Sequence, residues 1–303
     1  MPEIQIPTPS DFAFDRTVRS HGWFDLPPFA YDREAGTLRF AYQTGADVVS
    51  IAVRTAGRRS LVASVSARSA KAQSAAADVV RDVLRLDQDL GPVRAALARA
   101  PALVACVEAG SGRLMRAPTV FEDVTKMLCT TNCSWGLTRV IVGRLVEKAG
   151  APGPGGTRAF PTAEALAARP VAFFRDVARA GYRAPYLKAL ATRVAHGDLE
   201  LEALRGALPS DFVYERLRSI VGIGPYAADN LMRLLGHNDR LGLDSWCRAR
   251  YRKLYPRTPK MGAGLDAAIA RRYGIYSPYS GLAMWLDLTR TWHEPDAPNT
   301  FAP

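Results

Sequence analysis

The sequence predicts an α+β protein that is mostly helical and has an antiparallel β-sheet near its N-terminus. Two observations support this fold class. Between residues 37 and 65, short runs of alternating and β-branched residues are separated by single glycines, as in strands joined by tight turns. Beyond residue 70, apolar residues recur at helical spacing in one segment after another. A chain of 303 residues, 48% of them hydrophobic, can form two or three domains around an apolar core.

The individual elements are expected in this order along the chain. Strands are expected at Thr37–Tyr42, Val48–Val53 and Leu61–Val65, with turns at Gly36, Gly45 and Gly57. Helices are expected over residues 76–84, 93–98, 120–128, 139–148, 163–168, 171–179 and 187–194. The Pro-Gly-Pro-Gly-Gly run at residues 152–156 is a loop by composition.

The charge of the chain favours a polyanionic partner. Its formal net charge is +11, which suits nucleic acid but also suits membrane surfaces and ribosomal contacts. The sequence contains no apolar run of eighteen residues, so no membrane span is expected. The N-terminal residues lack a basic segment followed by an apolar one, so no secretory signal is expected. Together these features indicate a cytoplasmic protein.

The cysteines and histidines do not form a metal-binding pattern. The cysteines are Cys106, Cys129, Cys133 and Cys247, which is not the compact run that holds an iron–sulfur cluster. Cys129 and Cys133 are one helical turn apart, but a zinc site would need two further ligands. The histidines are scattered. We therefore expect reduced thiols with structural or surface roles, and no metal.

The most informative segment is a short turn, Gly222-Ile223-Gly224, between two apolar-periodic stretches. The first stretch carries Val213, Leu217 and Ile220 at helical spacing. Ser210 and Asp211 are good N-cap candidates for it. Glycine permits the tight backbone path that side chains would block.

The second stretch continues from Pro225 to Gly236. Proline suits the first position of a helix, and glycine suits the position after its end. The free N–H groups at the start of this helix therefore face outward from a turn without side chains, which is a site for a phosphate. Taken alone, an ordinary helical hairpin with glycines for close packing explains these residues equally well.

Three segments together carry a family resemblance. The first is Leu-x-x-Ile-x-Gly-Ile-Gly from Leu217, followed by Asp244 twenty residues after Gly224. The others are Phe121–Trp135 and the Gly-Tyr-Arg-Ala turn that begins at Gly181. Their order and spacing resemble the helix-hairpin-helix (HhH-GPD) DNA glycosylases, in the 3-methyladenine and 8-oxoguanine branches. The resemblance is strong over residues 115–295 and weak over the first hundred.

The resemblance implies base excision repair of double-stranded DNA that contains a damaged base. It implies three regions. Residues 1–110 would form an antiparallel β domain with trailing helices, and residues 111–209 a helical domain with a loop that wedges into DNA. Residues 210–303 would supply the hairpin and the C-terminal helices that complete the catalytic core. We expect a monomer that works in the cytoplasm, associated with the nucleoid.

Asp244 is the candidate catalytic residue. Hydrolysis of a glycosidic bond builds positive charge on the sugar, and a fixed carboxylate beside the sugar stabilises that charge. The carboxylate can also orient or deprotonate the attacking water. Taken alone, Asp244 is explained as well by an N-cap role for a helix over Ser245–Leu254. Its spacing from the hairpin favours the catalytic role, and both roles are compatible.

Tyr226 stands where bifunctional relatives carry a lysine that forms a Schiff base with the sugar. Tyrosine offers no amine, so we expect a monofunctional enzyme that uses water and leaves an abasic site. An aromatic ring here can stack on an electron-poor alkylated purine. Trp285, in a C-terminal helix, is a candidate second wall of the base pocket. Packing in the protein core is the alternative for both rings.

The resemblance also assigns residues to DNA contacts. Asn132 occupies the wedge position, where its amide can hydrogen-bond the orphaned base; closing a loop is the alternative. Arg183 resembles an arginine that reads the orphaned cytosine, and a solvated or phosphate-binding arginine is the alternative. Gly222, Ile223 and Gly224 are expected to hold a phosphate through their backbone N–H groups.

Departures from the 8-oxoguanine branch favour an alkylated purine as the substrate. Leu137, Asn230 and Met284 stand where that branch carries an arginine, a cysteine and a glutamine. Excision of 8-oxoguanine and silent binding of damaged DNA remain the alternatives. Whether Asp287 and Trp292 reach the pocket is open at this stage.

No organic cofactor is expected from the resemblance. Some relatives carry an iron–sulfur cluster after the catalytic aspartate, but here only Cys247 follows Asp244. A monovalent cation bound by the carbonyls of the hairpin is compatible with the family.

Overall fold

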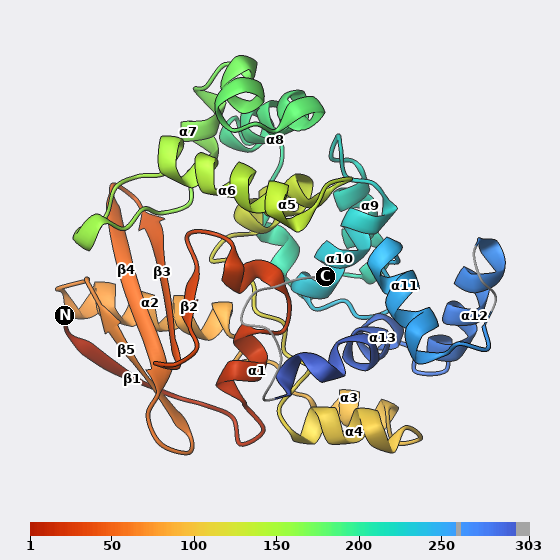
Figure 1. Ribbon diagram of the computed structural model, residues 1–303. Coiled ribbons are helices and arrows are strands. Elements are labelled where there is room, and N and C mark those ends of the chain that lie inside the picture. The colour runs from red at the N-terminus through yellow and green to blue at the C-terminus, as the bar shows by residue number, and fades with distance from the viewer. Residues whose placement is uncertain (259–261, 295–303) are drawn as a thin grey trace.

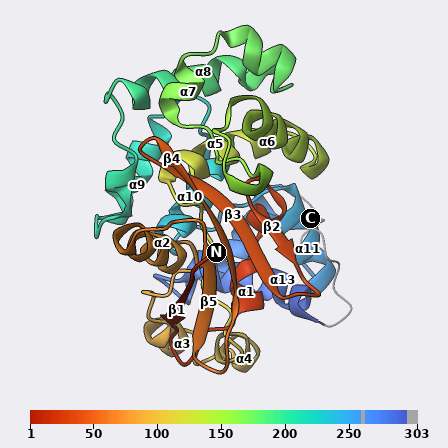
Figure 2. The ribbon, with the colours of Figure 1, turned by 90° about the vertical axis from the view of Figure 1, so that its left-hand side faces the viewer.

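A computed structural model describes residues 1–258 and 262–294. An antiparallel sheet of five strands forms the N-terminal part, and helices form the rest (Figures 1 and 2). The strand order is β1 (Glu3–Pro7), β5 (Ser60–Val65), β4 (Asp47–Thr55), β3 (Thr37–Thr44), β2 (Ala30–Asp32). The predicted fold class is confirmed. The sequence analysis identified β3, β4 and β5, but it missed the two edge strands.

The register of the sheet follows from its side-chain pattern. In the β3–β4 hairpin, Leu38 pairs with Val53 and Phe40 pairs with Ile51, and all four side chains are buried. Gly45 has φ +59° in the connection, a conformation that favours glycine. The long helix α2 (Ala70–Val83) contacts β1, β4 and β5, so it covers one face of the sheet (Figure 2).

The helical part contains the hairpin and the predicted site residues. Its helices are α1 (Phe14–Val18), α3 (Gly91–Ala96), α4 (Pro101–Glu108), α5 (Val120–Thr130), α6 (Trp135–Ala149), α7 (Ala163–Ala167), α8 (Ala184–Ala195), α9 (Ser210–Arg218), α10 (Pro225–Leu235), α11 (Ser245–Leu254), α12 (Ala263–Gly274) and α13 (Ser280–Thr289). The helix expected over residues 171–179 is helical over residues 171–177, and Phe173–Val177 within it forms a π-helical turn. No helix in the described ranges is both long and apolar enough to cross a membrane.

Helix α5 is the central element of the helical part. Every residue from Val120 to Cys129 is buried, and the helix contacts α6, α8 and α10 (Figure 1). Its charges are buried with it: Lys126 Nζ lies 2.6 Å from Glu122 Oε1 and 4.5 Å from the centre of the Phe29 ring. Asp123 Oδ1 accepts hydrogen bonds from the indole of Trp23 (2.7 Å) and the backbone N–H of Ala117 (2.9 Å). This helix therefore joins the N-terminal region to the hairpin.

Candidate active site

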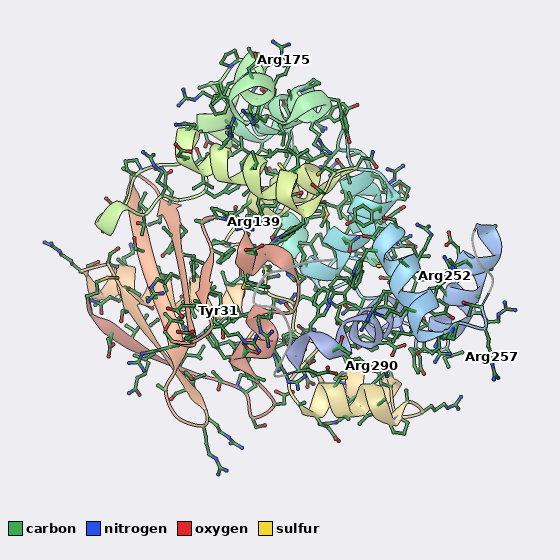
Figure 3. The ribbon with its side chains drawn as sticks, viewed as in Figure 1. Tyr31, Arg139, Arg175, Arg252, Arg257 and Arg290 are labelled. Carbon is green, nitrogen blue, oxygen red and sulfur yellow. The ribbon has the colours of Figure 1, made fainter. Side chains whose placement is uncertain are left out.

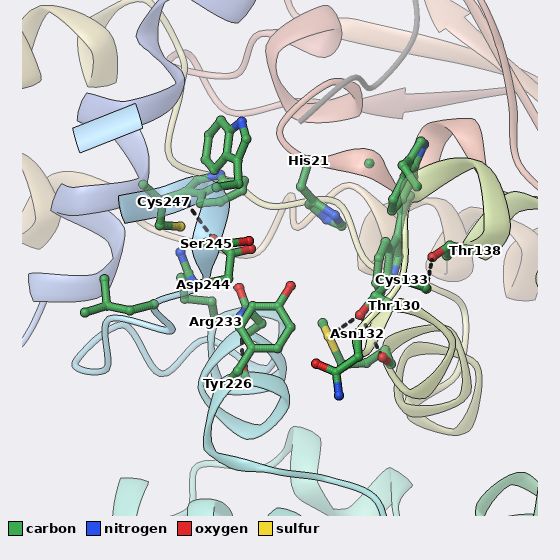
Figure 4. Close-up of a pocket in the computed structure, with 18 of the residues that line it drawn as sticks. His21, Thr130, Asn132, Cys133, Thr138, Tyr226, Arg233, Asp244, Ser245 and Cys247 are labelled. Atoms are coloured by element: carbon green, nitrogen blue, oxygen red, sulfur yellow. Dashed lines mark hydrogen bonds between the residues drawn. The ribbon is translucent and has the colours of Figure 1, made fainter. Parts of the chain in front are cut away.

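A pocket of roughly 990 Å³ lies where the N-terminal region, the end of α5, α10 and the start of α11 meet (Figure 4). Its lining brings together four of the predicted site residues: Asn132, Tyr226, Asp244 and Trp285. The first and last of them, Asn132 and Trp285, are more than 150 positions apart in the sequence. The backbone turn Gly222-Ile223-Gly224 and the side chain of Arg183 are not part of this lining.

Asp244 is the N-cap of α11, which was one of the two roles expected for it. Its Oδ1 accepts a hydrogen bond from the backbone N–H of Cys247 at 2.6 Å. The Cys247 thiol also forms a side-chain hydrogen bond with Asp244, and the Asp244 side chain is partly exposed in the pocket. The start of α11 therefore fixes the carboxylate, and its exposed part can meet a ligand or a water.

The loop before Asp244 is tied to α10, the second helix of the hairpin. The backbone N–H of Gly242 donates to Asp229 Oδ2 (3.2 Å), and Arg233 Nη2 donates to the Leu241 carbonyl (3.3 Å). Gly242 has φ +64°, and a Cβ at this position would lie 2.6 Å from Arg233 Nη2. The hairpin thus sets the position of Asp244, which gives a physical reason for their spacing in the sequence.

Tyr226 is the second residue of α10 and lies largely buried beside the pocket. Burial raises the pKa of its phenol, and the nearby charge of Asp244 raises this pKa further. The side chain is therefore a neutral phenol at physiological pH. Asn230, one turn along the same helix, donates to the Tyr226 carbonyl (2.8 Å) and also lines the pocket.

Asn132 lies at the tip of the loop between α5 and α6, with the left-handed φ of +45°. Its Nδ2 donates to the Tyr182 hydroxyl at 3.4 Å. Ser134 then caps α6 by accepting from the Leu137 N–H (3.3 Å), which is why α6 begins earlier than the expected residue 139. The wedge position is thus presented by a short, locally fixed turn.

Arg183 does not present its charge to solvent, contrary to the expected DNA contact. Its side chain is 3% exposed. Its guanidinium donates to the Thr131 carbonyl and, at 3.2 Å, to the Thr131 hydroxyl. In this structure Arg183 holds the loop that carries Asn132. The neighbouring residue Tyr182 contacts the same loop, because its hydroxyl accepts the hydrogen bond from Asn132.

The hairpin turn has the predicted backbone path. Gly222 has φ +92°, and a Cβ there would lie 2.8 Å from the ring of Tyr186. Pro225 begins α10, and Gly236 ends it in the left-handed conformation (φ +100°), as expected. The N-cap expectation for α9 is wrong: Pro209 precedes the helix, and Ser210 instead donates to Asp239 at 2.9 Å.

The expected phosphate site is corrected at one residue. The N–H of Ile223 donates to the Ile220 carbonyl at 3.0 Å, and the Ile223 side chain is 3% exposed. Ile223 therefore packs the turn from inside. The backbone N–H of Gly224 forms no hydrogen bond within the described ranges, and no atom lies within 4 Å of the site of its absent Cβ. Gly224 and the first turn of α10 keep free donors for an anion.

The carbonyls of this turn do not fit a monovalent cation. Arg218 Nη1 donates to the Ile223 carbonyl at 2.6 Å, and the Ile220 carbonyl accepts the Ile223 N–H. A guanidinium carries the positive charge that a bound cation would bring to the same oxygen. A second positive charge beside it would be repelled.

His21 and Arg233 are among the pocket residues that the sequence analysis missed. His21 belongs to the N-terminal region; its Nε2 bonds to the Met115 carbonyl, and burial lowers the pKa of the imidazole to about 4, so it is neutral. Arg233 lines the pocket from α10 and is 2% exposed. Arg233 had a sequence signal, because it interrupts the apolar run Leu231–Leu235 on the buried face of a helix. His21 had no such sequence signal, since most of the other residues that line the pocket are distant from it in the sequence.

Two questions left open by the sequence are resolved. Asp287 lies away from the base pocket and accepts from the hydroxyls of Tyr255 (2.5 Å) and Tyr273 (2.7 Å). Trp292 packs against Trp246 and Trp285, with ring centres 5.4 and 5.5 Å apart. The indole of Trp285 itself donates to the Ser20 carbonyl at 2.9 Å, so the N-terminal region fixes this wall of the pocket.

The sequence matches no protein-family model and no curated protein. Solved structures do match. A 3-methyladenine DNA glycosylase from Archaeoglobus fulgidus aligns with a TM-score of 0.73 and 20% identity, over 95% of this chain and 98% of that one. The apo form of Clostridium acetobutylicum 8-oxoguanine glycosylase/lyase aligns with a TM-score of 0.73 and 22% identity, over 95% and 96%.

A third similar structure is a Schizosaccharomyces pombe 3-methyladenine DNA glycosylase in complex with abasic DNA. It aligns with a TM-score of 0.51 and 21% identity, over 66% of this chain and 97% of that chain. These likenesses establish that the chain has the fold of the helix-hairpin-helix DNA glycosylases. The first two extend to the N-terminal sheet, where the sequence resemblance was weak.

Proposed function

We propose that this protein is a monofunctional DNA glycosylase, which hydrolyses the bond between a flipped damaged base and its sugar in double-stranded DNA. The observation that carries the proposal is the placement of Asp244. Its carboxylate lies in a pocket large enough for a base, and the loop that delivers it is bonded to the helix behind the glycine turn. A grip on the DNA backbone would therefore place the carboxylate at a fixed distance from the sugar.

The proposed chemistry follows from that placement. A base that leaves the duplex enters the pocket between Tyr226 and Trp285, and Asn132 enters the space it leaves. As the glycosidic bond breaks, positive charge develops on the sugar, and the Asp244 carboxylate stabilises it. The Asp244 carboxylate accepts a proton from the water that attacks the sugar, while the Cys247 N–H holds Oδ1 in place.

Hydrolysis without a covalent intermediate is proposed because the pocket lacks an amine. Tyr226 occupies the position beside Asp244, and no lysine is among the described residues that line the pocket. Lys126, on neighbouring α5, is completely buried and paired with Glu122. A Schiff base with the sugar therefore has no nucleophile. The expected product is an abasic site in an otherwise intact strand.

The proposed partner is a polyanion, and the surface of the protein suits it. Arginines such as Arg139, Arg175, Arg252 and Arg257 extend from separate elements around the molecule (Figure 3). We propose that a single protein molecule binds the duplex through the wedge loop and the turn at Gly224. No organic cofactor is proposed, and Arg218 takes the role that a monovalent cation would have at the hairpin carbonyls.

A panel of damaged duplexes tests the proposal. The protein is incubated with duplexes that carry 3-methyladenine, hypoxanthine, 1,N6-ethenoadenine, uracil or 8-oxoguanine, and the strands are analysed with and without alkaline cleavage. We expect breaks at one or more lesions only after alkali, and no adduct after borohydride reduction. A borohydride-trapped adduct would instead indicate a lyase of the 8-oxoguanine type. Salt-dependent binding without excision of any base would indicate a silent DNA-binding protein.

A further inference from the structure

Arg233 is a buried cation in the wall of the pocket, and the proposed mechanism gives it no role. Its side chain is 2% exposed, and it is the only arginine besides Arg248 among the described residues that line this pocket. Burial of an unpaired charge is costly unless the group has a polar partner. None of the ion pairs within the described ranges includes Arg233. Its Nε and Nη1 atoms are buried without a hydrogen-bond partner in the same ranges.

One edge of the guanidinium is fixed by the protein. Nη2 donates to Asn230 Oδ1 (2.6 Å) and to the Leu241 carbonyl (3.3 Å). The Cζ atom of Arg233 lies over the ring of Trp285, 5.0 Å from the ring centre. The side chain is therefore held in one orientation, and it still has donors to offer.

The groups around Arg233 do not neutralise it at contact distance. Asp229 and Asp244 are the nearby carboxylates, and Tyr226 and Cys247 are nearby weak acids. Asp229 is engaged by the Gly242 N–H, and Asp244 by the Cys247 N–H. His21, on the opposite wall, is buried and neutral, so it adds no charge. The pocket thus combines a catalytic carboxylate with a positive wall.

We propose that Arg233 is a specificity-determining residue, which admits neutral bases that carry a hydrogen-bond acceptor and rejects positively charged ones. This inference rests on the proposed glycosylase function. A guanidinium can only donate hydrogen bonds, so it complements a carbonyl oxygen or an unprotonated ring nitrogen. Purines that carry both, such as hypoxanthine, present the pair of acceptors that arginine binds with two donors.

The same geometry opposes a cationic base. Recognition of an alkylated, positively charged purine depends on electron-rich aromatic faces. Here Arg233 already lies over the ring of Trp285, and it would repel a second positive charge placed beside the same ring. The structure therefore argues against the alkylated purine that the sequence favoured, when that purine is cationic, and for neutral damaged bases.

The test compares two lesions in otherwise identical duplexes. One carries hypoxanthine, which is neutral, and the other carries 7-methylguanine, which is cationic. Single-turnover excision rates are measured for the wild-type protein and for Arg233→Met, which keeps the length and apolar contact of the side chain. We expect wild type to prefer hypoxanthine and the preference to fall by about 10- to 100-fold in the variant, the discrimination of one bidentate contact.

The readout is a ratio of two rates on one preparation, so any loss of folded protein cancels. Arg233→Lys keeps the charge but not the paired donors, and it should still reject 7-methylguanine. Arg250→Met is the matched control, because Arg250 bonds to the Leu288 carbonyl and Thr291 outside the pocket, and its ratio should equal that of wild type. A wild-type preference for 7-methylguanine, or an unchanged ratio in Arg233→Met, would overturn the role of Arg233. Absence of any excision by wild type would instead overturn the proposed function.

Discussion

At the scale of single residues, Asp244 caps α11, and experiment can separate this structural role from its proposed catalytic one. Asparagine caps helices as well as aspartate does, because its side-chain oxygen accepts the same N–H. It carries no charge to stabilise a sugar cation. We expect Asp244→Asn to change the free energy of unfolding by less than about 0.5 kcal/mol and to lower single-turnover excision by about a hundred- to a thousandfold.

A cap elsewhere in the chain provides the matched control. Ser69 caps α2 by accepting from the Ala72 N–H at 3.2 Å, far from the pocket. Ser69→Ala should lower the free energy of unfolding by about 1 kcal/mol and leave excision unchanged. Denaturant unfolding and excision assays on both variants should therefore give opposite patterns. Full excision by Asp244→Asn would exclude the carboxylate from the mechanism.

The residues that sequence reasoning found share a feature. Tyr226 lies in the hairpin motif, and Asp244 follows it at a short distance along the chain. Local sequence patterns therefore predict that the two residues lie close together. Arg183 was identified as a candidate, but the direction in which its side chain points was not predicted. A sequence does not show which neighbour a long side chain will reach. His21 entered the pocket through contacts with distant segments, which no local pattern reveals.

At the scale of elements, the hairpin depends on two glycines for different reasons. Gly222 adopts φ +92° and faces the ring of Tyr186, so a side chain there is strained and has no room. Gly224 has an ordinary φ of −82° and open space where its Cβ would be. The first glycine therefore shapes the turn, while the second leaves room for a phosphate.

Alanine at these two positions should separate folding from DNA binding. Gly222→Ala should destabilise the protein by about 1–3 kcal/mol from its backbone conformation alone. Gly224→Ala should leave the free energy of unfolding nearly unchanged and weaken DNA binding by about tenfold, because the added methyl group occupies the space of the phosphate and weakens its hydrogen bond to the backbone N–H. Denaturant titrations and binding isotherms at one salt concentration measure both effects. Equal DNA affinity of Gly224→Ala and wild type would place the phosphate elsewhere.

Arg218 gives the hairpin a second testable property. Because its guanidinium bonds to the Ile223 carbonyl, DNA affinity should be the same within about twofold in sodium, potassium or choline chloride at equal ionic strength. Arg218→Ala exposes that carbonyl, so its affinity should become dependent on the cation supplied. Fluorescence anisotropy with an abasic duplex measures both proteins. A wild-type affinity that depends on the cation would show that the guanidinium is displaced.

Sequence reasoning was strongest for elements that are stabilised by their own residues. The β3–β4 hairpin and α10 begin and end at local signals, such as Gly45, Pro225 and Gly236. The edge strand β1 was missed because it is defined by pairing with β5, nearly sixty residues away. The helix expected over residues 171–179 ends at residue 177 and contains a π-helical turn, which its apolar periodicity did not reveal.

At the scale of the whole molecule, the N-terminal region forms part of the candidate active site. The Ser20 carbonyl holds the indole of Trp285, and His21 and Trp23 line the pocket. Sequence patterns predicted only an architectural role for this region, because its contacts join the first and last parts of the chain. The fold alone brings them together.

Asp123 lies at the junction of these parts and makes the stability of the whole protein depend on pH. Burial raises the pKa of its carboxyl to about 7, although the charge of Arg205 and bonds from the Ala117 N–H and the Trp23 indole act in the opposite direction. The folded protein therefore holds a proton that the unfolded chain, with a pKa near 3.8, releases above about pH 4. This contribution to stability is complete below pH 4 and is lost as the pH rises through about 7.

Asparagine at position 123 can accept both hydrogen bonds and cannot ionise, so the stability difference between Asp123→Asn and wild type isolates this proton. That difference should rise in favour of the variant between about pH 4 and pH 7 and then level off, reaching at most about 4 kcal/mol for a shift of three units. Histidines such as His21, whose pKa is lowered to about 4, reduce the stability of both proteins equally at acidic pH and cancel. Urea titrations at intervals of one pH unit measure the curve. A difference that stays constant from pH 5 to pH 8 would show that Asp123 is ionised throughout, with Arg205 as its effective partner across the junction.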